Sequence, residues 1–224
     1  MDSLLNNFFN IEIFQQVLPF LLTGLMTTIG LSALVIPLGL IGGLVVALLA
    51  TQSTSRTARI MIAIYVDVFR ALPPLVLLIF IYFGFPFLGI DLPKLLAVAL
   101  GFFLNNSAYY GEIFRAGLLS VPHGQMEAAQ STGLNRMQAL IYVVVPQAIR
   151  NVLPDLLSNS IEVVKLTTLA SVVALPELLR VARDAQSLLY NPSPIVLAAL
   201  IYLAILWPLV RLLSRLEHKN MMAR

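Results

Sequence analysis

The feature that most constrains the fold is a charge-free stretch near the N-terminus. No Asp, Glu, Lys or Arg occurs between Glu12 and Arg56. A helix needs roughly 20 apolar residues to cross a bilayer, so this stretch has room for a long membrane-spanning helix. Of the whole chain, 59% of residues are hydrophobic and 11% are charged, whereas soluble domains carry about 25% charged residues. The sequence therefore predicts an all-α integral membrane protein.

The hydrophobic pattern predicts about five transmembrane helices. Pro37, followed by Gly39, Gly42 and Gly43, predicts a kink and a close helix contact in the first of them. The fourth is interrupted by polar residues and is interpreted as a helix followed by a shorter helical piece at about 168–188. The five spans are expected at about 17–50, 60–84, 94–115, 138–165 and 194–214.

Basic residues set the expected orientation, because short cytoplasmic loops are enriched in Lys and Arg. An external N-terminus leaves only Lys94, Arg180 and Arg183 outside. The C-terminus is then cytoplasmic, and so is the segment 112–138. The bases placed on the cytoplasmic side are Arg56, Arg59, Arg115, Arg136, Arg211, Arg215, Lys219 and Arg224.

Composition excludes several classes of function. The bases are scattered and the net charge is only +3, so no nucleic-acid partner is expected. The chain has no cysteine, and His123 and His218 are its only histidines. Thiolate metal sites and disulfides are therefore excluded, and no metal site is expected.

One polar segment, with Gly133 at its centre, separates the third span from the fourth. Pro122 can begin a short helix, and Gly133 can end it, because glycine adopts positive φ without strain. Asn135 is a good N-cap for a second helix that continues into the membrane. The pattern predicts a helix, a turn and a helix on the cytoplasmic face; an ordinary polar loop is the alternative.

Several spaced motifs resemble the permease subunits of ABC importers. Glu127-Ala128-Ala129, followed by Gly133, Ile141 and Pro146, is similar to the EAA signature of that family. More of the chain resembles one branch of this family, the polar amino-acid permeases, and this similarity runs from about residue 18 to the C-terminus. Its Arg-Gly-Thr-Pro and Lys-Asp-Thr-Ser-Leu elements correspond to Arg70-Ala-Leu-Pro73 and Lys165-Leu-Thr-Thr-Leu169, with Ala71, Leu72 and Leu166 departing from the pattern. Further matches are Leu104-Asn-Asn-Ser-Ala-Tyr-Tyr-Gly-Glu-Ile-Phe-Arg115 and Pro146-Gln-Ala-Ile-Arg150.

The resemblance implies a type I importer permease fold, with residues 1–224 forming one transmembrane domain. The domain core is expected at about 18–216 and the coupling-helix segment at 121–137. The implied partners are a cytoplasmic ATP-binding cassette ATPase, a second identical or paralogous permease subunit, and an extracytoplasmic substrate-binding protein. The chain has no Gly-x-x-x-x-Gly-Lys-[Ser/Thr] phosphate loop, so ATP and Mg are expected on the ATPase and no cofactor on this chain.

By the same resemblance, the protein is expected to import polar amino acids across the bacterial inner membrane by alternating access, without catalysing covalent chemistry. Cationic amino acids are expected if Glu162 holds the basic side chain of the substrate. The coupling helix is expected to contact the ATPase. The residues assigned to this contact are Glu127, Ala128, Ala129, Gly133 and Arg136.

Three polar residues in the second and third spans are candidate substrate ligands. The planar guanidinium of Arg70 suits a substrate carboxylate, and the alternative is an ion pair with Asp67 or an interfacial position. Asn105 and Asn106 offer both donors and acceptors to an amino acid. Hydrogen bonding between helices is their alternative role.

The fourth helix carries three more candidates. Glu162 is expected to hold the substrate ammonium or a basic side chain, and an ion pair with Lys165 or Arg150 is the alternative. Lys165 and Thr168 are expected to line the same cavity, although a threonine hydroxyl can instead bond back to its own helix.

A stand-alone secondary transporter or channel for small polar solutes is the competing function. Such folds often contain internal repeats, and this sequence shows none.

Overall fold

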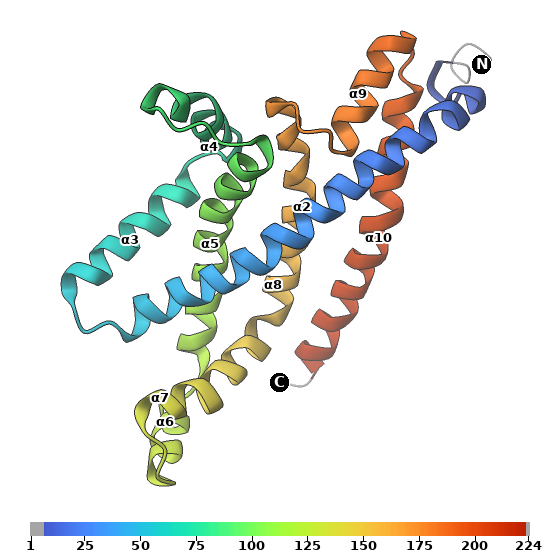
Figure 1. Cartoon of the computed structure of the whole chain (residues 1–224). Coiled ribbons are helices and arrows are strands. Elements are labelled where there is room, and N and C mark those ends of the chain that lie inside the picture. Colours follow the sequence, from blue (N-terminus) through green and yellow to red (C-terminus); the bar gives the residue numbers. More distant parts are fainter. Residues whose placement is uncertain (1–6, 223–224) are drawn as a thin grey trace. The chain divides into compact units, whose positions relative to one another are not determined.

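A computed structural model describes residues 7–222 of the chain and the side chains of residues 7–215, and it confirms the all-α fold (Figure 1). The side chains of His218 and Lys219, and the whole of Arg224, lie outside the described part. The α-helices are α2 (Ile11–Gln52), α3 (Arg56–Ala71), α4 (Pro74–Ile79), α5 (Lys94–Ser120), α6 (His123–Ser131), α7 (Arg136–Ala139), α8 (Val145–Leu166), α9 (Leu178–Leu189) and α10 (Ser193–Met222). Shorter π or 3-10 stretches are η1 (Phe80–Gly84), η2 (Phe85–Leu88), η3 (Leu140–Val144) and η4 (Thr167–Val173).

Among the described residues, three helical segments are long and apolar enough to cross a membrane: Ile11–Gln52, Arg136–Val173 and Ser193–Arg215. The bent pair of α3 with α4–η2 adds a fourth if it counts as one span. The third expected span lies within α5 but is not among these segments, because asparagines and other polar residues near its middle lower its hydropathy. The number of five spans and their orientation stay predictions.

The second expected span is not one continuous helix. α3 ends at Ala71, and Leu72 has an extended backbone with φ −73 and ψ 127. Pro73 explains the break, because a proline disfavours the helical conformation of the residue before it. Pro74 then begins α4, a position at which its missing N–H costs little.

The helical piece expected at about 168–188 is also divided. α8 continues into the 3-10 helix η4, and Ala174 ends η4 in the left-handed conformation at φ 55. A short non-helical connection containing Pro176 follows, and α9 begins at Leu178. The expected fourth helix over about 138–165 is confirmed, with α7, η3 and α8 forming its continuous path.

The described residues form two compact units. Unit 1 contains the chain up to Val35, Pro74–Gly101 and the chain from Ile161 onward. Unit 2 contains Ile36–Pro73 and Phe102–Ser160.

Unit 2 is built on a close crossing of α2 and α5. A Cβ atom added to Gly43 would lie 2.4 Å from the Cβ of Tyr110 and 2.8 Å from the backbone N of Gly111. Only glycine therefore permits the two backbones to approach this closely. The contact predicted from the glycines of the first helix is confirmed here.

Unit 1 has a core where α9 packs against α2 and α10. Its buried members are Val17, Leu21, Leu178, Ala182 and Ala198. Figure 1 shows α9 and α10 side by side, in agreement with the contacts between them.

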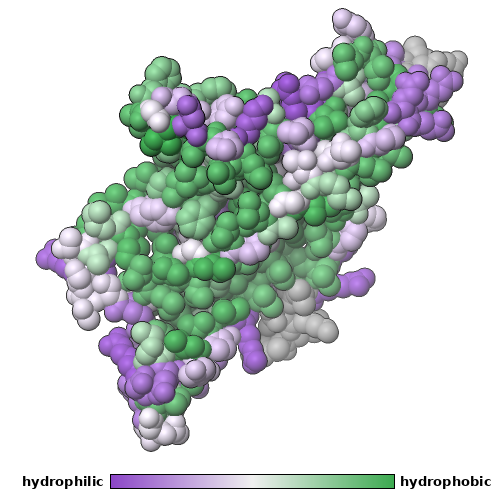
Figure 2. Space-filling model, viewed as in Figure 1, coloured by the Kyte–Doolittle hydropathy of each residue, from purple (hydrophilic) through white to green (hydrophobic). Residues whose placement is uncertain are grey.

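Hydrophobic residues cover most of the helical surface in the view of Figure 2, and hydrophilic residues gather over α6 and α7. Large apolar side chains of α2 point outward, with Phe20, Met26 and Ile41 each more than 60% exposed. A surface of this kind is compatible with lipid rather than water. The α6–α7 hairpin is compatible with water.

Candidate functional site

The polar segment folds as the sequence predicts, into a helical hairpin of α6 and α7 within unit 2 (Figure 1). Pro122 occupies the N-cap of α6. Gly133 has φ 95, a conformation that residues with a Cβ adopt only with strain. The Gly133 N–H donates to the carbonyl of Gln130 at 3.0 Å, and the Leu134 N–H to that of Ala129 at 3.4 Å. This pair of bonds is the Schellman motif, which satisfies the last carbonyls of a helix.

A capping box begins α7 directly after the turn. The Gln138 N–H donates to Oδ1 of Asn135 at 2.9 Å, and the Asn135 N–H donates to Oε1 of Gln138 at 3.0 Å. These reciprocal bonds satisfy two backbone donors and fix where the second helix starts. The turn is thus defined from both sides.

The small residues of α6 do not share one environment. Ala129 is 7% exposed and packs inside unit 2, whereas Glu127, Ala128 and Ser131 are exposed. The exposed residues form a face that a partner can reach. Ala129 instead permits close packing of α6 on its own unit.

A groove of about 450 Å³ lies beside the hairpin within unit 2. Glu127 and Arg136 both line it, with the ends of α2 and α5 forming other parts of its wall. Arg136 donates from Nη2 to Oε1 of Gln52 at 3.2 Å, which connects α7 to the last residue of α2. The hairpin is therefore in direct contact with the end of a helix that is long and apolar enough to cross a membrane.

Arg70 lies near the end of α3, and Asn105 of α5 contacts the same helix end. Asn105 is 1% exposed and donates from Nδ2 to the carbonyl of Phe69 at 2.8 Å. The Tyr109 hydroxyl donates to the carbonyl of Arg70 at 3.3 Å, and the Arg70 guanidinium lies over the Tyr109 ring at 5.5 Å. Both bonds satisfy carbonyls that a helix end leaves without partners.

The contacts of Asn106 and Arg70 differ from the hydrogen bond between helices and the ion pair that the sequence offers as their alternatives. Asn106 is 1% exposed and donates from Nδ2 to the Phe102 carbonyl of its own helix at 2.8 Å. Arg70 forms no ion pair with Asp67 among the described residues. Its exposed guanidinium is held by the aromatic ring and can still contact a ligand.

The candidates of unit 1 lie together on α8 and η4. Glu162 and Lys165 form an ion pair, which is one of the alternatives predicted for Glu162. Both side chains are about half exposed, at 58% and 48%. The Thr168 hydroxyl donates to the Lys165 carbonyl at 2.8 Å, the back-bonding expected as its alternative.

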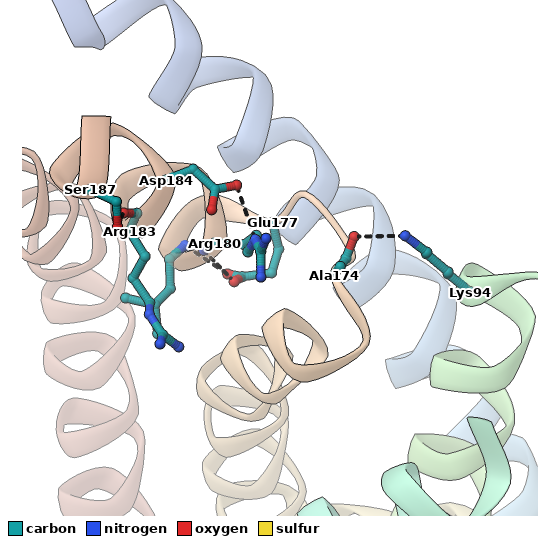
Figure 3. A network of polar contacts seen from close by, with 8 residues as sticks. Lys94, Ala174, Glu177, Arg180, Arg183, Asp184 and Ser187 are labelled. Atoms are coloured by element: carbon teal, nitrogen blue, oxygen red, sulfur yellow. Dashed lines mark hydrogen bonds and ion pairs between the residues drawn. The ribbon is translucent and has the colours of Figure 1, made fainter. Parts of the chain in front are cut away.

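Sequence reasoning missed the polar contacts that tyrosine and serine make within unit 2. The Tyr65 and Ser107 hydroxyls lie 2.6 Å apart, and those of Tyr110 and Ser160 lie 2.8 Å apart. The signal was present, because hydroxyl groups in apolar helices need partners. In unit 1 it missed Glu177, which is fully buried at the start of α9 (Figure 3).

No group of three or more His, Cys, Asp or Glu residues within reach of one metal ion occurs in the described part of the chain.

Comparison with known proteins gives a consistent result. Residues 39–220 match the family described as binding-protein-dependent transport system inner membrane component. The probable amino-acid ABC transporter permease YckA of Bacillus subtilis is 35% identical over 198 residues, which is 88% of this chain and 87% of that protein. The probable glutamine ABC transporter permease GlnP of Bacillus subtilis is 36% identical over 207 residues, covering 91% and 94%.

A solved structure agrees with these relatives. The crystal structure of an amino acid ABC transporter with histidines has a chain 34% identical to this one, with a TM-score of 0.82. The match covers 92% of this chain and 96% of that chain. With its apolar helices and its polar hairpin, the chain belongs to the family of inner membrane components of binding-protein-dependent transport systems.

Proposed function

We propose that this chain is the permease subunit of an ATP-driven importer that carries polar, cationic amino acids into the cytoplasm by alternating access. The relatives named as amino-acid permeases support the solute class. The structure solved with histidines supports a solute that can carry a positive charge. The chain itself supplies the path and catalyses no covalent step.

The observation that carries the proposal is the α6–Gly133–α7 hairpin. It is polar, has capping bonds on both sides of its Gly133 turn, and leaves Glu127 and Ala128 exposed. Such a rigid element can seat on a partner and transmit displacement to α2 through Arg136 and Gln52. Ala129 contributes from inside by packing α6 on unit 2.

The partners follow from this role. A cytoplasmic ABC ATPase binds ATP and Mg and contacts the hairpin, whereas this chain binds no cofactor. A second permease subunit, identical or paralogous, completes the path, and an extracytoplasmic binding protein delivers the solute. The chain forms one transmembrane domain over residues 1–224, with its core at about 18–216, in the bacterial inner membrane with its N-terminus outside.

Two groups of residues contact the amino acid in this proposal. Arg70, Asn105 and Asn106 belong to unit 2, where the Arg70 guanidinium suits the substrate carboxylate. Glu162, Lys165 and Thr168 belong to unit 1. The Glu162 carboxylate exchanges its Lys165 partner for the ammonium or the basic side chain of the solute.

Replacing Gly133 tests the coupling role. Asp at this position must adopt φ 95 at a cost of roughly 1–2 kcal/mol, enough to shift a conformational equilibrium five- to thirtyfold. In the reconstituted importer, Gly133→Asp is expected to retain membrane insertion and ATPase assembly while uptake per ATP hydrolysed falls at least about fivefold.

Gly124→Asp is the matched control. Both glycines have no atom within 4 Å of an added Cβ, but only Gly133 has positive φ. The control is expected to couple normally, since it adds the same charge to the same hairpin without backbone strain. Normal coupling in Gly133→Asp would contradict the proposal.

A second experiment separates the importer from a stand-alone transporter. Uptake by the chain reconstituted with its ATPase is expected to require internal ATP and to be unaffected when ion gradients are collapsed. Uptake by the chain alone, driven by a sodium or proton gradient, would support the competing function.

A further inference from the structure

Glu177 is a carboxylic acid with 0% exposure at the N-cap of α9 in unit 1. Three donors converge on its two oxygens. Oε1 accepts from the Arg180 N–H at 2.7 Å, and Oε2 accepts from the Leu179 N–H at 2.8 Å. Oε2 also accepts from the Tyr202 hydroxyl of α10 at 3.2 Å. A glutamate is almost never fully buried unless it has such partners.

The same helix start is joined to α2. The Leu178 N–H donates to Oγ1 of Thr28 at 3.2 Å. The first three N–H groups of α9 are therefore satisfied by Thr28 and Glu177, and the Tyr202 hydroxyl links them to α10. We call Thr28, Glu177 and Tyr202 the Glu177 cluster.

Charged groups around the cluster do not neutralise the carboxylate by direct pairing. Arg180 pairs with Asp184 at 3.0 Å, and Lys94 of α5 donates to the Ala174 carbonyl at 3.3 Å (Figure 3). Arg183 favours the carboxylate electrostatically without forming an ion pair with it among the described residues. Tyr202 is the titratable group that α10 presents to it.

We propose that Glu177 is a positioning residue whose proton uptake holds the start of α9 against α2 and α10, and whose proton release frees α9 to move. The role in transport rests on the proposed function, whereas the effect on α9 does not. The carboxyl gains one proton on Oε2, and Oε1 continues to accept from the Arg180 N–H. The Tyr202 oxygen then accepts the new O–H, and the hydroxyl proton of Tyr202 turns to the neighbouring hydroxyl oxygen of Thr28 or Thr167, so the link to α10 is retained in reverse.

The direction of the pH effect on α9 follows from the linkage between proton binding by Glu177 and docking of α9. Burial raises the pKa of the Glu177 carboxyl, and its hydrogen bonds only partly oppose that effect. When α9 opens, the carboxyl reaches water and its pKa returns toward the ordinary value. The docked state therefore binds more protons, so acid favours docking and alkali favours opening.

Hydrogen exchange of the α9 amides in the assembled transporter tests this directly. After correction for the intrinsic pH dependence of exchange, wild-type amides at the start of α9 are expected to exchange roughly two- to tenfold more slowly at pH 5 than at pH 8. Glu177→Gln keeps the shape of the side chain but cannot titrate, so its corrected exchange is expected to be equal at both pH values.

Two further variants serve as matched controls. Tyr202→Phe removes a hydrogen bond that is stronger to the carboxylate than to the protonated carboxyl, so it is expected to move the midpoint of the wild-type transition to higher pH. Thr28→Val removes the partner of the Leu178 N–H and is expected to speed its exchange at both pH values with the transition retained. An unchanged midpoint in Tyr202→Phe decides against the proposal even if Glu177→Gln does not assemble.

Two results of the exchange experiment would contradict the role of Glu177. The same pH dependence in wild type and Glu177→Gln, or faster wild-type exchange at pH 5, overturns the assignment. Absence of ATP-dependent uptake at every pH contradicts the proposed function alone, because the exchange data judge the Glu177 cluster independently.

Discussion

Single residues fix the local structure of this chain where few residue types fit the backbone conformation or where a charged group needs a specific partner. Gly133 and Asn135 are such residues, because a positive φ and a capping box together define the hairpin. Both could be predicted from the sequence, since glycine ends helices and asparagine begins them for local reasons. Tertiary packing was not needed to infer either.

Glu162 offers a prediction about the solute. Glu162→Gln is expected to lower the uptake of arginine or lysine by about tenfold, a loss near 1.4 kcal/mol in binding, and to leave neutral amino acids within about twofold. Competition uptake assays measure the ratio. Asp184→Asn removes another exposed, ion-paired acid and is expected to change neither; an equal loss for cationic and neutral solutes would remove the assignment of Glu162.

Glu177 offers a prediction about stability. Because burial raises its pKa, the folded state binds more protons than the unfolded state between the ordinary and the raised pKa values. Stability from this group is therefore greatest in acid and falls as pH rises through the raised pKa. Thermal unfolding in detergent is expected to show the wild-type midpoint falling from pH 5 to pH 7 relative to Glu177→Gln; a constant difference between the two proteins contradicts this sign.

At the scale of elements, the sequence predicts helices well and their breaks less well. The long first helix and the α6–α7 hairpin follow from composition and capping residues. The break at Leu72 was missed because the apolar pattern continues through Pro73 and Pro74, although two successive prolines were a sufficient signal. Pro176 likewise indicated the end of the helical piece before α9.

Side-chain partners could not be predicted in the same way. Asn105 was correctly identified as a polar residue in an apolar helix, but its partner, the carbonyl of Phe69, lies 36 positions away in the sequence. Glu177 carries no local signal, because Ser, Thr, Asp and Asn are the usual N-caps and its burial depends on α2 and α10. Such contacts depend on which helices pack together, and periodicity alone does not specify this.

The crossing of α2 and α5 gives a prediction for an element. Gly43→Ala places a Cβ 2.4 Å from Tyr110 Cβ, so the helices must separate, with an expected cost of about 1–3 kcal/mol. Gly30→Ala lies on the same helix with no atom within 4 Å. It is expected to be neutral or to stabilise by roughly 0.5–1 kcal/mol through helix propensity.

Thermal unfolding of the two alanine variants, measured in the same detergent, checks the crossing. A lower midpoint is expected for Gly43→Ala only. Equal midpoints would show that the helices at Gly43 are not closely packed.

At the scale of the whole molecule, the proposed function depends on how the chain is oriented in the membrane. The proposed function requires the hairpin to lie in the cytoplasm, where an ATPase can reach it, and the basic residues of α9 are expected outside. The placement of basic residues predicts this orientation, and the exposure of Glu127, Ala128 and Ser131 makes the hairpin accessible to a partner.

Accessibility of single cysteines tests the orientation most directly, since the chain has no cysteine of its own. Ser131→Cys places a thiol on the exposed end of α6, and Ser187→Cys places one on the exposed face of α9. A membrane-impermeant maleimide is expected to label Ser131→Cys only in inside-out vesicles and Ser187→Cys only in intact cells whose outer barrier has been removed. Labelling of Ser131→Cys from the external medium would contradict the account, because the hairpin could not then meet a cytoplasmic ATPase.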